Sequence, residues 1–251
     1  MFNPEEIQNI ARHEQDLWWY RGMRRIAFAL LDPICQNRPR MGILEGGCGT
    51  GHFAARVHER YGAAVFGAEL DAGAARLCGE TPGLRCARAD LRAIPYRDGS
   101  FDAAILMDVL SHIAPGEERP VLAEIHRVLR PGGRLAIRTS ALDIFRSAHS
   151  AFIWEQQRFS RRRLRSAVAA AGFAVLRATY SNFFLSPIAL LKFRVWEPWA
   201  RQSPASGLER LPAPLEAVFH RALCAEAWLI RQGIDFPFGQ SLCLVAEKPG
   251  G

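Results

Sequence analysis

The stretch that decides the fold reads Ile43-Leu44-Glu45-Gly46-Gly47-Cys48-Gly49-Thr50-Gly51. A short apolar run leads into it at 41–44, and a helix-like segment follows it over 51–61. Glycine permits positive φ angles and lets the backbone approach a ligand closely. The first N–H groups of the following helix have no partner inside that helix, so they face the loop. The stretch therefore predicts a ligand-binding turn between a strand and a helix.

A glycine-rich loop alone leaves several kinds of site open, because dinucleotide and phosphate sites use the same device. The loop lacks the Gly-Lys-Ser/Thr that a phosphate-cradling P-loop requires. Its Gly47-x-Gly49-x-Gly51 spacing also differs from the G-x-G-x-x-G fingerprint of nicotinamide and flavin sites. Both details point away from those two classes of site.

Apolar runs alternate with amphipathic stretches along most of the chain. They predict strands at 41–44, 63–68, 84–89, 101–107, 134–138, 173–180 and 240–247, and helices at 4–17, 20–31, 51–61, 71–78, 120–129, 160–171, 187–199 and 214–232. This alternation favours a doubly wound, Rossmann-like α/β fold whose seven-stranded sheet is mostly parallel, with the last strand antiparallel. We expect a single domain over 1–251, made of an N-terminal helical cap (1–38), a cofactor-binding core (40–181), a helical substrate or lid insertion (182–239) and a last strand with a tail (240–251).

Acidic residues stand at the ends of the second and third predicted strands. Glu69 follows the glycine loop by about 20 residues, the spacing at which a carboxylate accepts the hydroxyl groups of a ribose in doubly wound folds. Asp90 is placed to accept a hydrogen bond from an adenine amino group. Either residue alone could instead be a helix cap or a turn residue. Together with the loop they predict a site for an adenosine-containing cofactor.

These features resemble the motifs of class I S-adenosylmethionine-dependent methyltransferases. The resemblance covers the glycine loop, 67–69, 89–91, 100–113 and 127–133. It implies that S-adenosyl-L-methionine is the cofactor and S-adenosyl-L-homocysteine the product. It also implies a set of cofactor-binding residues at the strand ends: Glu45, Gly46, Gly47, Cys48, Gly49, Gly51, Glu69, Leu70, Asp90, Leu91, Met107 and Asp108. Glu45 and Glu69 depart from the family's usual aspartate by one methylene each, and we expect binding to survive with shifted backbone contacts.

A narrower resemblance concerns the N-terminal segment. His13 followed by Trp18-Trp19-Tyr20-Arg21-Gly22 is similar to the opening of a bacterial methyltransferase subgroup that often accompanies natural-product or cell-envelope glycan pathways. It implies that Tyr20 and Arg21 contact the cofactor, Arg21 through the methionyl carboxylate. Simple packing of the N-terminal helix on the core is the alternative. The chain departs from the subgroup's later His-Asp and His at Ser150 and Glu155, whereas His149 and Arg158 match.

Methyl transfer from a sulfonium needs little catalytic machinery, because alignment alone can contribute roughly 7–11 kcal/mol. His112, after the fourth strand, and His149, after the fifth, are candidate bases, and a structural role is the alternative for each. The aromatic residues of 182–239 are expected to shape the acceptor site or a homodimer face. Contact of 183–199 with a membrane surface is a weaker expectation, since its polar face is thin.

We therefore expect methyl transfer to an O, N or C atom of a small molecule such as a natural product or a cell-envelope, glycan or lipid intermediate. The net charge of +7 comes almost entirely from scattered arginines, so no nucleic-acid partner is expected. RNA methylation, a non-catalytic binding protein, and arsenic or thiol methylation are alternatives; the placement of the cysteines within strands and helices argues against the last. No cysteine spacing predicts a zinc site or another metal centre. Without a signal peptide or a membrane-spanning run, the expected location is cytoplasmic.

Overall fold

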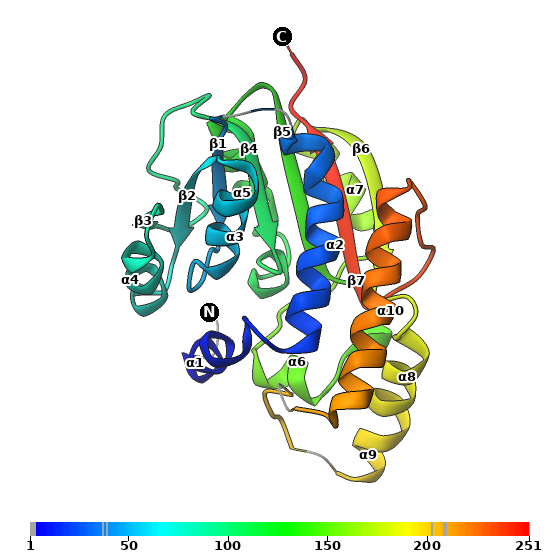
Figure 1. Ribbon diagram of the computed structural model, residues 1–251. Helices are drawn as coiled ribbons and strands as arrows, with labels where there is room; N and C mark the ends of the chain where they lie inside the picture. Colours follow the sequence, from blue (N-terminus) through cyan, green and yellow to red (C-terminus); the bar gives the residue numbers. More distant parts are fainter. Residues whose placement is uncertain (1–3, 37, 39, 202, 208–209, 251) are drawn as a thin grey trace.

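A computed structural model describes residues 4–36, 38, 40–201, 203–207 and 210–250. Its centre is a seven-stranded sheet in the order β3-β2-β1-β4-β5-β7-β6, with helices packed around it (Figure 1). The strands are β1 (Gly42–Gly46), β2 (Ala64–Glu69), β3 (Arg85–Arg88), β4 (Phe101–Met107), β5 (Leu129–Ser140), β6 (Ala174–Ser181) and β7 (Ser241–Glu247). β7 runs antiparallel to both of its neighbours, and every other pairing is parallel. The predicted fold class is confirmed.

Helices cover the sheet and close one of its edges. The crossovers are α3 (His52–Tyr61), α4 (Ala72–Glu80), α5 (Glu118–Val128) and α7 (Arg161–Ala170), while α1 (Pro4–His13) and α2 (Trp18–Cys35) precede the sheet. Between β6 and β7 the chain forms α8 (Ser186–Leu191), a π-helical turn η3 (Lys192–Trp196), α9 (Glu197–Trp199) and α10 (Ala213–Arg231). α10 lies alongside α2, so the insertion and the N-terminal segment share one flank of the molecule (Figure 1).

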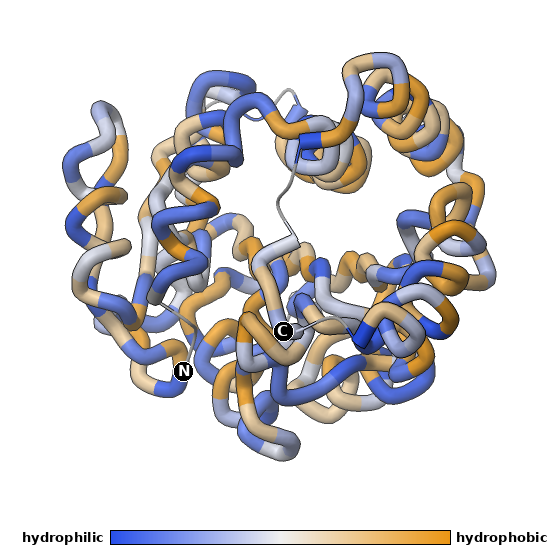
Figure 2. The backbone as a smooth tube through the Cα atoms, turned by 90° about the horizontal axis from the view of Figure 1, so that it is seen from below, coloured by the Kyte–Doolittle hydropathy of each residue, from blue (hydrophilic) through white to orange (hydrophobic). Residues whose placement is uncertain are grey.

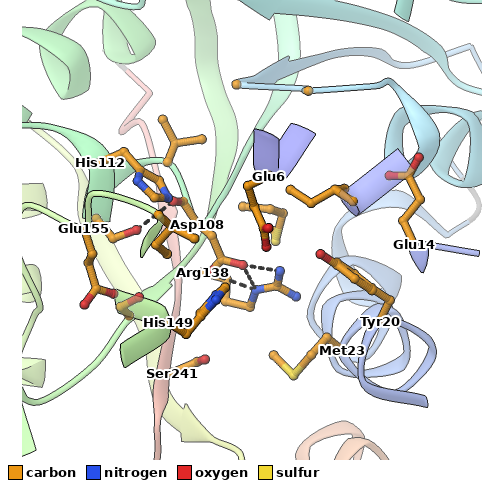
Figure 3. A pocket seen from close by; sticks show the side chains of 18 of the residues that line it. Glu6, Glu14, Tyr20, Met23, Asp108, His112, Arg138, His149, Glu155 and Ser241 are labelled. Carbon is orange, nitrogen blue, oxygen red and sulfur yellow. Dashed lines mark hydrogen bonds and ion pairs between the residues drawn. The ribbon is translucent and has the colours of Figure 1, made fainter. Parts of the chain in front are cut away.

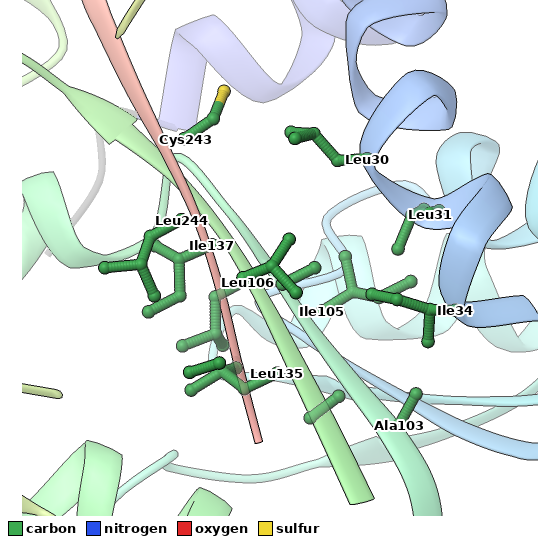
Figure 4. Close-up of a cluster of buried hydrophobic side chains, with 14 of the residues drawn as sticks. Leu30, Leu31, Ile34, Ala103, Ile105, Leu106, Leu135, Ile137, Cys243 and Leu244 are labelled. Carbon is green, nitrogen blue, oxygen red and sulfur yellow. The ribbon is translucent and has the colours of Figure 1, made fainter. Parts of the chain in front are cut away.

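The core forms because the central strands are apolar on both faces. Ile105, Leu106 and Ile137 are fully buried between helices and neighbouring strands, as a mostly parallel sheet requires. Leu31 of α2 packs into the same cluster, shown in Figure 4. Hydrophilic and hydrophobic residues alternate along the helices in Figure 2, the pattern of helices with one face on a core. Within the described part of the chain, no helix is long and apolar enough to cross a membrane.

Two predicted helix ends were wrong. The first helix ends at His13, because the following turn is held by Arg24, which donates to the carbonyl of Gln15 at 2.9 Å. The second was expected to stop at Asp32-Pro33 but continues through Pro33 to Cys35. Pro33 lies in the last turn of α2. Ile34 and Cys35 follow it and are buried in the core, which stabilises the helical conformation there.

Two short helices after β5 were not predicted. They are η2 (Asp143–Phe145) and α6 (Ala148–Phe152), and a third short turn, η1 (Leu110–His112), follows β4. α6 begins with a capping box between Ser147 and Ser150. In addition, the Ala148 amide donates to the carboxylate of Glu197 at 2.8 Å. The second contact joins α6 to the insertion, so no local pattern could have revealed it.

Candidate functional site

A cavity of about 1300 Å³ lies at the carboxyl ends of β1, β2, β4 and β5. Residues of α1, α2, α8 and α10 complete its walls. Ligands of open α/β sheets bind at this edge, where the strand order reverses on either side of β1. The predicted core, cap and insertion thus meet around a single space, part of which Figure 3 shows.

The glycine loop forms the floor of the cavity. The Gly47 amide donates to the carbonyl of Ala68 at 2.7 Å, which joins the end of β1 to the end of β2. A Cβ atom on Gly47 would lie 2.4 Å from Val109, and the φ angle of +68° is unfavourable for other residues. At Gly49, whose φ is +54°, a Cβ atom would meet nothing within 4 Å and would enter open space. The loop therefore presents bare backbone to a ligand.

Glu45 places a buried carboxylate beside the loop. Its side chain is 3% exposed, and its Oε2 atom has no hydrogen-bond partner among the described residues. Burial raises the pKa of this carboxyl, the Cys78 thiol and the carboxylates of Glu14 and Glu69 raise it further, and Arg138 opposes them. Burying an unpaired carboxylate is costly, so a cationic group of a ligand in the cavity would be stabilised here.

Glu69 lies at the end of β2, where it was predicted. Its Oε2 accepts the Gly49 amide and its Oε1 accepts the Asp71 amide, both at 2.9 Å. Each carboxylate oxygen can accept a second hydrogen bond, and the half-buried side chain lines the cavity beside the exposed Leu70. Its position is compatible with ribose hydroxyl donors.

Asp90 also lines the cavity, but its carboxylate is engaged. Arg92 approaches to 2.6 Å and donates from its side chain and backbone. This arginine lowers the pKa of the Asp90 carboxyl and also contacts Glu117 at 3.0 Å. Leu91, 8% exposed, supplies an apolar wall next to it. A role for Asp90 toward adenine stays a prediction, and it would share the carboxylate with Arg92.

At the end of β4, Met107 and Asp108 line the cavity as predicted. Asp108 has a φ of +60° and turns its carboxylate toward Arg138, whose Nε donates to both oxygens at 3.0 and 3.2 Å. Arg138 is buried, and its guanidinium lies 5.8 Å from the ring of Trp19 (Figure 3 shows the ion pair). Arg138 was not predicted, because its place at the cavity depends on Asp108, which lies at the end of the neighbouring strand.

Tyr20 and Arg21 have different environments. Tyr20 lines the cavity, and burial raises the pKa of its hydroxyl, which stays protonated and able to donate. Arg21 is exposed and is not among the residues that line the cavity, and its contact with the cofactor stays a prediction. One residue along a helix turns the side chain by about 100°, which carries Arg21 to the solvent side. Met23 and Arg24 reach the cavity instead.

Two glutamates of the N-terminal segment were missed. Glu6 of α1 is 2% exposed and points toward the cavity in Figure 3. Glu14, just after α1, accepts the Thr50 hydroxyl at 2.7 Å and so joins this segment to the glycine loop. Burial raises the pKa of the Glu14 carboxyl. Glu6, Ile10 and Glu14 are spaced four residues apart, which predicts that they share one side of a helix. This spacing could have revealed both glutamates from the sequence.

His112 of η1 and His149 of α6 both line the cavity. Burial lowers both pKa values, that of His112 to about 4, so both imidazoles are neutral at pH 7 and their protonated forms are disfavoured. Glu155 stands nearby with a buried side chain and pairs with Arg158 at 2.7 Å. The structure thus brings both predicted histidines to one wall (Figure 3), and their catalytic role stays a prediction.

The insertion supplies mostly apolar wall. Its contribution consists of Leu185, Ile188, Ala189, Phe193, Leu211, Leu215 and Phe219, with a few polar side chains that include Asn182, Lys192 and Glu197. The cavity therefore combines polar groups at the strand ends with an apolar region between α8 and α10.

Comparison with known proteins identifies the core. Residues 44–137 match the model of a methyltransferase domain. Demethylmenaquinone methyltransferase of Thermus thermophilus is 38% identical over 128 residues, which cover 49% of this chain and 54% of the relative. Methyltransferase GfsG of Streptomyces halstedii is 37% identical over 102 residues, covering 38% and 36%. The chain thus spans about half or less of the length of these relatives.

Solved structures extend the likeness to nearly the whole fold. Geranyl diphosphate C-methyltransferase from Streptomyces coelicolor, solved with S-adenosyl-L-homocysteine, superposes with a TM-score of 0.60 at 19% identity and covers 88% of this chain and 79% of its own. The [4+2]-cyclase SpnF superposes with a TM-score of 0.60 at 21% identity, covering 93% and 84%. These structures share the fold, and the matched domain and relatives specify the family. Residues 44–137 therefore form a methyltransferase domain, and its fold is that of the class I S-adenosylmethionine-dependent methyltransferases.

Proposed function

We propose that the protein transfers a methyl group from S-adenosylmethionine to a hydroxyl oxygen of an apolar small molecule. The observation that carries this proposal is the cavity itself. It is about 1300 Å³, larger than the 300–1,000 Å³ of typical single-ligand pockets, and it therefore has room for a donor and an acceptor together. Its polar strand ends suit the donor, and its apolar wall suits the acceptor.

The donor would lie over the glycine loop. The buried, unpartnered oxygen of Glu45 fits the ammonium group of the methionyl part, and the free lone pairs of Glu69 fit the ribose hydroxyls. Tyr20 and Met23 would cover the donor from α2. A cationic donor also suits the excess of carboxylates at this end, where Glu6, Glu14 and Glu45 gather.

When bound, S-adenosylmethionine supplies an activated methyl group on a sulfonium. Held by Glu45 and Glu69, the donor would give this methyl group to the acceptor oxygen and would keep the electron pair of the broken carbon–sulfur bond on sulfur. The hydroxyl proton must leave, and a neutral His112 or His149 on the cavity wall can accept it. An acceptor that carries a proton is therefore favoured over one that does not.

The apolar region points to the class of acceptor. Ile188, Phe193 and Phe219 can bury a hydrocarbon body, at about 25 cal/mol for each Å² removed from water. A natural product or a lipid-like intermediate with one hydroxyl group would meet this surface and place its polar end near the histidines. O-methyltransferases of Pyrenophora dematioidea and Penicillium expansum, 33% and 34% identical over the aligned residues, are among the relatives.

The test uses labelled S-adenosylmethionine with a panel of apolar phenols and alcohols. Ala189→Trp fills the apolar region and should lower kcat/KM for an accepted hydroxyl compound at least about tenfold while leaving S-adenosyl-L-homocysteine affinity unchanged. The matched control is Leu191→Trp on the same helix, because Leu191 is exposed and does not line the cavity. Methylation confined to nitrogen, carbon or RNA would contradict the proposed acceptor, and no transfer to any component of a cell extract would contradict the activity.

A further inference from the structure

Three cysteines that lie far apart in the sequence meet beneath the glycine loop. Cys48 belongs to that loop, Cys78 to α4 and Cys86 to β3. Their sulfur atoms all lie within 4.8 Å of one another, and Cys48 is 3.5 Å from each of the other two. The cluster could not be predicted from the sequence, since its members have no metal-binding spacing. It forms because β1, β2 and β3 are adjacent and bring the segments around their ends together.

Gly67 makes room for the three thiols. A Cβ atom at this position would lie 2.5 Å from the Cys48 sulfur and 3.1 Å from each of the others. All three sulfurs therefore converge over one bare stretch of backbone. Packing alone would be satisfied by a single larger side chain at any of these positions, whereas three convergent thiols form a set of soft ligands.

The geometry suits a centre with three ligands. In the described part of the chain, no histidine or carboxylate joins the group as a fourth ligand. Structural zinc sites take four protein ligands in tetrahedral geometry, and a zinc ion held by these three thiols alone would need a water molecule as its fourth ligand. A trivalent arsenic atom is complete with three thiolates in a pyramid, whose narrower angles bring the sulfurs closer together. In the ligand-free protein the two separations of 3.5 Å are hydrogen-bond contacts between thiols, and they place the sulfurs near enough for one trivalent atom to bind all three.

The charges around the cysteine cluster also favour a trivalent centre over a divalent one. Glu45 and Glu69 act electrostatically on this cluster, and two of its thiols are buried. Three thiolates around a divalent metal leave a net negative charge, which is costly in a buried site next to carboxylates. Three thiolates around trivalent arsenic form a neutral complex. The surroundings of the cluster therefore favour a trivalent centre.

We propose that Cys48, Cys78 and Cys86 form a binding site for a trivalent thiophilic metalloid, with arsenite as its soluble form. Binding forms three sulfur–arsenic bonds and breaks three arsenic–oxygen bonds. Each thiol proton leaves with one hydroxyl group as water, so three waters are released and arsenic keeps its oxidation state. Occupancy would tie the glycine loop to α4 and β3.

The ligand can reach the cluster. Cys48 lines the cavity and Cys86 is partly exposed, so the site has a route from solvent. The hydrogen bond donated by Cys48 lowers the pKa of the Cys78 thiol. Because the thiolate is the attacking form, Cys78 is the first nucleophile expected to react.

The test is native mass spectrometry of the reduced, full-length protein with one equivalent of sodium arsenite. We expect one adduct whose mass equals that of arsenic less three hydrogens. Cys86→Ser should remove this adduct and weaken arsenite binding at least about tenfold, leaving at most an adduct that retains one hydroxyl group. Cys78→Ser should do the same. The matched control, Cys224→Ser, lies outside the cluster and should retain the three-thiol adduct.

Thermal unfolding without arsenite identifies any variant that fails to fold, and arsenite should raise the Tm of the wild type but not that of Cys86→Ser. A wild-type adduct that retains a hydroxyl group would overturn the three-thiol site. Persistence of the three-thiol adduct in Cys86→Ser would place it elsewhere and overturn the assignment. Tighter binding of zinc chloride than of arsenite would overturn the trivalent class.

Discussion

The carboxylate of Glu69 holds two backbone amides and faces the cavity at the same time. Glu69→Ala should weaken S-adenosyl-L-homocysteine binding at least about tenfold, since a charged hydrogen bond contributes roughly 1.5–3 kcal/mol. Isothermal titration calorimetry measures the change. Glu80→Ala, on the exposed side of α4, is the control and should bind as the wild type does. Unchanged affinity in Glu69→Ala would remove Glu69 from the cofactor site.

Asp90, which follows β3, is paired with Arg92. Either of these two side chains could make the contact with adenine. If Asp90 accepts from adenine, Asp90→Ala weakens S-adenosyl-L-homocysteine binding by less than Glu69→Ala does, because Leu91 still packs against the base. Arg92→Ala then leaves affinity unchanged or tightens it, since the carboxylate is released from the contact at 2.6 Å. Competition binding with labelled cofactor measures both. Strong loss of binding in Arg92→Ala, with little effect of Asp90→Ala, would transfer the adenine contact to the arginine.

His112 should make the protein less stable in mild acid. Its pKa is about 4 in the folded state and about 6.5 when unfolded, so between these values the unfolded chain binds more protons. This contribution is present above about pH 6.5 and is lost as pH falls toward 4, by about 2 kcal/mol between pH 7 and 5. Urea unfolding at pH 7, 6 and 5 measures it. His112→Gln should show a smaller loss over this range, and an equal loss in both proteins would contradict the shift.

Some residues could be placed at the cavity from the sequence and others could not. The difference lies in their positions within strands and helices. Glu69 and Asp90 follow strands, and the ends of parallel strands meet at one edge, so their place at the cavity was predictable. Whether Arg21 faces the cavity depends on the rotation of α2 about its axis. Whether Arg138 does depends on which strand end lies beside the end of β5. Such orientations are set by packing between distant elements, which one sequence does not contain.

At the scale of elements, Glu226 fixes how the insertion leaves the sheet. This fully buried side chain of α10 accepts the amides of Asn182, Phe183 and Phe184 at 2.5, 2.8 and 3.4 Å. Burial raises the pKa of its carboxyl to about 7 even though these amides oppose the shift. The contacts secure the turn after β6, where Asn182 has a φ of +61°.

Glu226→Ala should therefore lower the free energy of unfolding by about 2–4 kcal/mol, because it leaves buried amides without an acceptor. Glu226→Gln keeps one carbonyl oxygen and should cost less. Urea denaturation monitored by circular dichroism gives both values. Val218→Ala, at an exposed position of the same helix, should stay within about 0.5 kcal/mol of the wild type. Equal effects of Glu226→Ala and Val218→Ala would contradict the role of the carboxylate.

The elements themselves were predictable to different degrees. The central strands were, because burial on both faces requires continuous apolar runs such as 101–107. The continuation of α2 beyond Pro33 was not, since the Asp32 carboxylate there accepts from Arg60 and Tyr61 of α3 at 2.8–2.9 Å. Pro33 predicts the end of a helix, but contacts between α2 and α3 keep the chain helical beyond it. Only the folded structure reveals these contacts.

At the scale of the whole molecule, the cavity joins segments from both ends of the chain. The glycine loop indicated one wall, but α1, α8 and α10 supply others. The aromatic residues of 182–239 predicted that the insertion shapes the acceptor site, but not which of its helices reach the cavity. The cysteine cluster is a similar case, because proximity in three dimensions follows from strand order. Strand order could be expected from the family resemblance, whereas the convergence of Cys48, Cys78 and Cys86 could not.

The position of β7 between β5 and β6 has a consequence for assembly. β6 pairs only with β7 among the described strands, and β7 comes last in chain order. During synthesis, β6 therefore has no strand to pair with until the whole insertion and then β7 have emerged from the ribosome. Until that moment the far edge of β5 offers unpaired backbone groups to any other nascent chain. A chain released before β7 is made would therefore keep an unpaired strand edge, and such edges promote aggregation.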